Sequence, residues 1–139
     1  MNMSPEKLIF IVSIILVGSL IISFVYNKMP KKLKHDKFVT EWKKIQKMCA
    51  DKDQWKDAII KADDLLDKAL KKKKFKGASM GERLVEAQKL FDKNDAVWFS
   101  HKLRGRIEAD PKLKLTKDDT KNALIGIGQA LKDLGALKK

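Results

Sequence analysis

The segment from Val97 to Glu108 carries the residues best suited to chemistry. If this segment is helical, His101, Arg104 and Glu108 follow Val97 at spacings of four, three and four, so an imidazole, a guanidinium and a carboxylate share one stripe beside the core face. Such a stripe could be functional. The alternative is an ordinary helix surface on which Arg104 and Glu108 form an intrahelical ion pair, worth about 0.2–0.5 kcal/mol.

Other chemical motifs are missing from the sequence. Neither histidine lies at a metal-ligand spacing from cysteines, aspartates or glutamates, so we expect no metal and no cofactor. Gly126 and Gly128 follow no strand and therefore predict no phosphate-binding loop. The acidic residues Asp63, Asp64 and Asp67 stand beside lysines on a predicted helix, and we expect them on a solvated face.

An apolar stretch of 19 residues without a charge, Leu8 to Tyr26, dominates the N-terminal part. As a helix it would be roughly 28 Å long, close to the ~30 Å hydrocarbon thickness of a bilayer. Signal-peptide cores are shorter, about 7–15 residues. Lysines follow the stretch at once and only Lys7 precedes it, so we expect a retained single span in the cell membrane with the N-terminus outside. A cleaved signal peptide and a buried core helix are the alternatives.

Five amphipathic helices are predicted after the apolar stretch, because apolar residues recur there every three or four positions. They cover roughly 36–50, 51–72, 79–92, 95–110 and 116–135. Ser79 and Thr116 stand three residues before an acidic residue, which is typical of a capping box, and Asp95 is expected to cap the fourth helix. The residues expected to face inward on that helix are Ala96, Phe99, Leu103 and Ile107.

No run of residues alternates with period two, so the fold class is all-α. Short connections between the helices favour a five-helix antiparallel bundle. The predicted organisation is an N-terminal transmembrane anchor (1–27), a basic juxtamembrane linker (28–35) and a cytoplasmic helical bundle (36–139). The single cysteine, Cys49, allows no intramolecular disulfide, which fits a reducing cytoplasm, and we expect it to be a small buried side chain.

The helix order, together with the segment HKLRGRIEAD, resembles HEPN domains, small all-α modules that often dimerise. HEPN ribonucleases carry an arginine and a histidine separated by four to six residues, and these side chains of the two protomers meet in the dimer cleft. Arg104 matches the arginine, but Gly105 replaces the usual polar residue and Ala109 stands where the histidine would be. The resemblance implies a module that keeps a binding or dimerising role without the general base that would activate a ribose 2′-hydroxyl.

The bundle is strongly basic. Lys7 and Glu6 cancel, so the net charge of +13 belongs to the residues after the apolar stretch. Such a charge attracts anionic lipid head groups or nucleic acid, or only improves solubility. Because Arg83, Arg104 and Arg106 are the only arginines, base-specific recognition is disfavoured. The expected basic surface comprises Lys71, Lys72, Lys73, Lys74 and Lys76, and the expected lipid-facing residues are Lys28, Lys31, Lys32 and Lys34.

These features predict a single-pass membrane protein whose cytoplasmic bundle is an interaction or scaffold module without a catalytic site. The candidates for binding a partner, either another protein or a second copy of the chain, are His101, Arg104, Arg106 and Glu108. The first alternative is a membrane-tethered RNA-binding protein, favoured by the net charge. The second is a HEPN-type ribonuclease, which the missing histidine disfavours.

Overall fold

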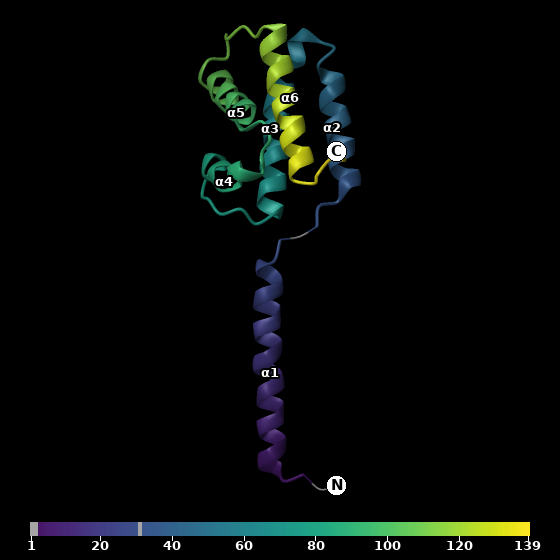
Figure 1. The fold of residues 1–139 in the computed structure, drawn as a ribbon, viewed down its shortest axis with the longest axis vertical. Helices are drawn as coiled ribbons and strands as arrows, with labels where there is room; N and C mark the ends of the chain where they lie inside the picture. Colours follow the sequence, from purple (N-terminus) through teal and green to yellow (C-terminus); the bar gives the residue numbers. More distant parts are fainter. Residues whose placement is uncertain (1–2, 31) are drawn as a thin grey trace. The chain divides into compact units, whose positions relative to one another are not determined.

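The computed structural model describes residues 3–30 and 32–139, and within them the chain is all-α (Figure 1). The α-helices are α1 (Pro5–Lys28), α2 (His35–Met48), α3 (Trp55–Lys72), α4 (Met80–Ala87), α5 (Asn94–Ala109) and α6 (Lys117–Asp133). Short 3-10 turns precede α3 (η1, Lys52–Gln54) and follow α4 (η2, Gln88–Leu90). The chain divides after Pro30 into one unit that holds α1 and a second unit that holds α2 to α6. The predicted fold class, an apolar N-terminal helix followed by a helical bundle, is confirmed.

Helix α1 is long and apolar enough to span a membrane. Its 24 residues would measure about 36 Å along the axis, somewhat more than the ~30 Å hydrocarbon thickness of a bilayer. None of its residues is buried. Ser4 is the N-cap and Pro5 the first helical residue, and the Lys28 ammonium lies 4.6 Å from the centre of the Phe24 ring.

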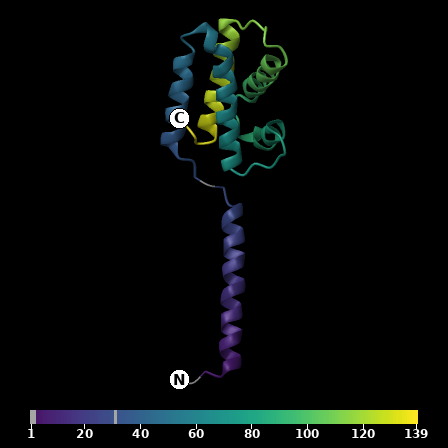
Figure 2. The same ribbon diagram turned by 180° about the vertical axis from the view of Figure 1, so that it is seen from behind.

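In the second unit, α3 packs against α2, α4, α5 and α6. Figures 1 and 2, which show opposite sides, both place α2, α3 and α6 lengthwise beside one another, with α4 and α5 inclined to them. The largest fully buried side chains include Phe38 of α2, Leu66 of α3 and Leu131 of α6. The packed core begins ahead of α2, because Leu33, in the segment predicted to be a linker, is only 5% exposed.

Two helices differ from the prediction. Helix α4 ends at Ala87 and continues as the 3-10 turn η2, so it is shorter than expected. Helix α5 begins at Asn94 after Lys93 rather than after Asp95, and no side chain caps it. Phe99, expected inside, is 37% exposed, whereas Ser100 is buried. The apolar pattern favoured the larger Phe99, but the face of α5 defined by Leu103 runs through the small Ser100.

Helix α6 lies unusually close to its neighbours at two glycines. A Cβ atom at Gly126 would lie 2.7 Å from the carbonyl oxygen of Ala96 on α5. One at Gly128 would lie 2.9 Å from Cζ2 of Trp42 on α2. Glycine inside a helix costs about 1 kcal/mol relative to alanine. Close packing on both sides of α6 therefore explains why the helix tolerates two of them.

Gly126→Ala is expected to destabilise the bundle by about 1–3 kcal/mol, because the added methyl meets backbone that cannot rotate away. The matched control is Gly105→Ala on α5, where a Cβ meets nothing within 4 Å. That change should stabilise the bundle by about 0.5–1 kcal/mol through helix propensity. Urea unfolding of a fragment of residues 32–139, which keeps Leu33, measures both. Effects of the same sign would contradict the described packing of α6 on α5.

Candidate functional site

The polar stripe of α5 forms as the sequence predicts. Nε of Arg104 donates a hydrogen bond to Oε1 of Glu108 at 3.0 Å, the predicted intrahelical pair. The ring of His101 lies edge-on to Trp98, with ring centres 6.0 Å apart. Arg106 is exposed and takes no part in these contacts. The structure thus brings together three of the four partner-binding candidates and leaves Arg106 apart.

The stripe faces α3, where Asp63 is fully buried. One oxygen of Asp63, Oδ2, lies 3.1 Å from Nδ1 of His101 and 3.3 Å from Nη1 of Arg104. Arg104 also forms an ion pair with Asp64, which is exposed. The other oxygen of Asp63, Oδ1, is buried without a hydrogen-bond partner. Arg104 is therefore shared among three carboxylates, two on α3 and Glu108 on its own helix.

The prediction that Asp63, Asp64 and Asp67 share a solvated face is wrong for Asp63 and for Asp67. The Asp67 side chain is 16% exposed and accepts two hydrogen bonds from Arg83 of α4, from Nε at 2.7 Å and from Nη2 at 2.9 Å. Nη1 of Arg83 donates to the carbonyl oxygen of Gly77 at 2.8 Å. Only Asp64 is exposed. Lys71 of α3 also pairs with Asp67, but Arg83, His101 and Arg104 come from other helices, and the lysine neighbours along α3 gave no sign of them.

The pairing shifts the protonation of these groups. The hydrogen bond to Asp63 raises the pKa of His101 above its ordinary value of 6.5, although partial burial and Arg104 act the other way. Burial alone would raise the pKa of Asp67, but hydrogen bonds from Arg83 and Lys71 outweigh it and lower that pKa. The stabilisation from His101 is therefore complete below pH 6.5 and disappears as the pH rises through the raised pKa.

The five lysines of the predicted basic surface differ in exposure and in their contacts. Lys71 pairs with Asp67 at 3.2 Å, and the Lys72 ammonium lies 5.7 Å from the centre of the Phe38 ring. Lys73 is half-buried, whereas Lys74 and Lys76 are exposed. Of the juxtamembrane lysines, Lys28, Lys32 and Lys34 are exposed, and Lys31 lies outside the described residues.

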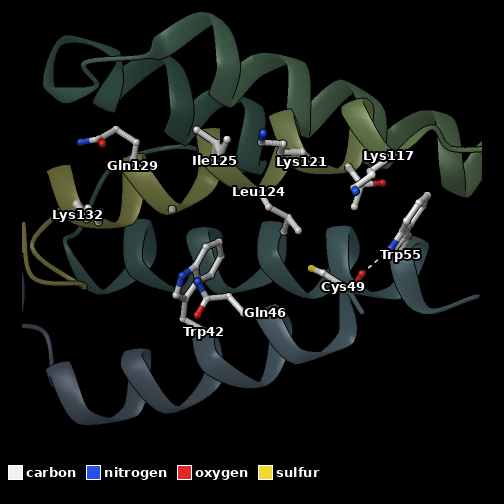
Figure 3. Close-up of a pocket in the computed structure, with 12 residues that line it drawn as sticks. Trp42, Gln46, Cys49, Trp55, Lys117, Lys121, Leu124, Ile125, Gln129 and Lys132 are labelled. Atoms are coloured by element: carbon white, nitrogen blue, oxygen red, sulfur yellow. Dashed lines mark hydrogen bonds between the residues drawn. The ribbon is translucent and has the colours of Figure 1, made fainter. Parts of the chain in front are cut away.

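A groove of about 480 Å³ lies between α2 and α6 (Figure 3). Trp42, Gln46 and Cys49 line it from the α2 side, and Trp55, at the start of α3, closes one end. The residues that line it from α6 are Lys117, Thr120, Lys121, Leu124, Ile125, Gly128, Gln129 and Lys132. None of the sequence-predicted site residues lines this groove. The sequence did hold one sign of it, since Ile125 is a large apolar residue of α6 that lies off the buried face of that helix, where Ala123, Ile127 and Leu131 lie.

The walls of the groove are fixed by specific contacts. The Trp42 ring packs against α6 at Gly128, where its Cζ2 occupies the space that a Cβ would need. Nε1 of Trp55 donates a hydrogen bond to the Cys49 carbonyl oxygen at 2.9 Å, drawn as the dashed line in Figure 3. Cys49 is half-buried, and burial raises the pKa of its thiol. The two tryptophans are thus held in place before any ligand arrives.

Comparison of the chain with protein families, curated proteins and solved structures finds no match. The HEPN resemblance stays a prediction from the sequence. The geometry bears on one part of it: the Arg104 guanidinium is engaged by Asp63, Asp64 and Glu108, and Ala109 is the last residue of α5.

Proposed function

We propose that this chain is a single-pass membrane protein whose helical bundle is a cytoplasmic interaction module without catalytic activity. The observation that carries the proposal is the groove between α2 and α6, an apolar depression with lysines on its α6 side. Apolar depressions with a few placed polar groups are the usual form of binding sites. The charged stripe of α5, the other candidate site, is engaged in pairs within the bundle.

Catalysis at the α5 stripe is disfavoured by the same pairs. A ribonuclease of the HEPN type would need Arg104 to hold a phosphate and an imidazole to take a proton from the 2′-hydroxyl. Arg104 is already paired with Asp63, Asp64 and Glu108, and Ala109 stands where the HEPN histidine would be. Binding of a ligand phosphate would therefore have to break ion pairs between α3 and α5.

Binding of RNA is the second candidate function, and one observation favours it. Trp42 and Trp55 line the groove together with Lys117 and Lys121, and single-strand binders combine aromatic side chains with a basic groove.

Attraction of the bundle to anionic lipid head groups remains part of the proposal, because Lys32 and Lys34 are exposed a few residues after α1.

Lysines follow α1 and are nearly absent before it, so the proposed orientation places the bundle in the cytoplasm. A membrane-impermeant maleimide should leave Cys49 unlabelled in intact cells and label it after lysis in denaturant, which also removes the protection due to burial. A cysteine introduced by Ser4→Cys in a Cys49→Ala background should react in intact cells. Reaction of that cysteine only after lysis would reverse the orientation.

The purified full chain is expected to leave single-stranded RNA intact over hours, with or without divalent metal, because Ala109 stands where the HEPN histidine would be and the Arg104 guanidinium is paired with carboxylates. Gel analysis of labelled RNA measures this. Cleavage that disappears in Arg104→Ala would establish an enzyme and refute the proposal. Binding of RNA without cleavage, falling steeply as salt increases, would favour the second candidate function instead.

A further inference from the structure

All the charged groups that line the groove have the same sign. Lys117, Lys121 and Lys132 lie along α6, and no aspartate or glutamate is among the described residues that line the groove. The lysines lie toward its two ends, two near the start of α6 and one near the end of that helix. Leu124 and Ile125 lie between them (Figure 3). The groove therefore combines an apolar middle with positive charge at both ends.

The dimensions of the groove suit one face of a helix. From Lys117 to Lys132, α6 advances by roughly 22 Å, about four helical turns. A helix with its side chains is about 10–12 Å wide, so a volume of about 480 Å³ admits side chains from one face and not a whole helix. Helices bind such grooves through apolar residues at positions i, i+3 or i+4, and i+7.

We infer that the groove binds an acidic amphipathic helix of a partner protein. The inference rests on the proposed function and specifies its partner. The apolar face of the helix contacts Trp42, Leu124 and Ile125, and acidic residues near both of its ends pair with the lysines. A fatty acid or a single head group carries its charge at one end and would leave Lys132 or the pair Lys117 and Lys121 unmatched.

The walls of the groove fit this helix better than a strand of RNA. Bases stack on open aromatic faces. The Trp42 ring is half-buried and packs against Gly128, and the indole of Trp55 is tied to the Cys49 carbonyl. Leu124 and Ile125 between the lysines offer contacts for apolar side chains and none for phosphates.

The test is a selection from a phage-displayed library of 15-residue helix-forming peptides. The target is the full chain in nanodiscs of neutral phosphatidylcholine, which removes competition by anionic lipid. Enriched peptides should carry apolar residues at i, i+3 or i+4, and i+7 together with a net negative charge. Tryptophan fluorescence then measures the affinity of a synthetic copy of the best peptide.

Charge reversal locates the binding site. The double variant Lys117→Glu with Lys121→Glu should lower the affinity for the best peptide by about tenfold or more, because both lysines are exposed and line the groove. The matched control is Lys112→Glu with Lys114→Glu, which changes the net charge equally at exposed positions outside the groove. Ile125→Ser should also weaken binding, and its 46% exposure makes unfolding an inadequate explanation.

The outcomes separate the inference from the proposed function. Enriched peptides that are neutral or basic, or that bind both double variants equally well, overturn the acidic-helix inference and leave an interaction module. If no peptide is enriched, and if the chain binds RNA in a way that Lys117→Glu with Lys121→Glu abolishes, both the acidic-helix inference and the proposed interaction module are overturned. Binding to phosphatidylserine vesicles alone, lost in the same double variant, also overturns the inference and assigns the groove to lipid.

Discussion

Asp63 imposes the strongest constraint on the bundle, because it is a carboxylate with no exposed surface in the middle of α3. An unpaired buried charge costs several kcal/mol, so its partners must lie beside it. His101 and Arg104 of α5 supply the charge and the hydrogen bonds to Oδ2. Helix α5 is thereby held against α3 with its polar stripe turned inward, and Arg83 fixes α4 to Asp67 one turn further along α3.

This arrangement decides where the molecule can bind anything. The groups of α5 best suited to chemistry pair within the bundle, whereas the groove on α6 carries lysines without carboxylate partners among the described lining residues. Packing of α6 on α5 at Gly126, and of Trp42 on α6 at Gly128, gives the groove a fixed wall. A rigid apolar surface flanked by charge is suited to recognition of a partner.

Local signals in the sequence predicted most of the fold. The capping box of Thr116 and Asp119 and the start of α4 after Ser79 stand where the pattern placed them. Contacts between helices could not be predicted from these local signals. A lysine-flanked Asp63 is typical of a solvated face, and only the approach of α5 makes that position buried. The groove could not be located from the sequence for the same reason. Trp42 and Ile125 belong to different helices, and the local spacing of residues does not determine how those helices are placed relative to each other.

The role of Asp63 is tested most directly by comparing Asp63→Asn with Asp64→Asn in urea unfolding of residues 32–139. Both changes remove one carboxylate that pairs with Arg104, but Asp63 is fully buried and Asp64 is exposed. Loss of a buried charged partner should lower the free energy of unfolding by about 1–3 kcal/mol, and loss of the exposed one by less than about 1 kcal/mol. Equal losses, or no loss at Asp63, would contradict the claim that this carboxylate joins α3 to α5.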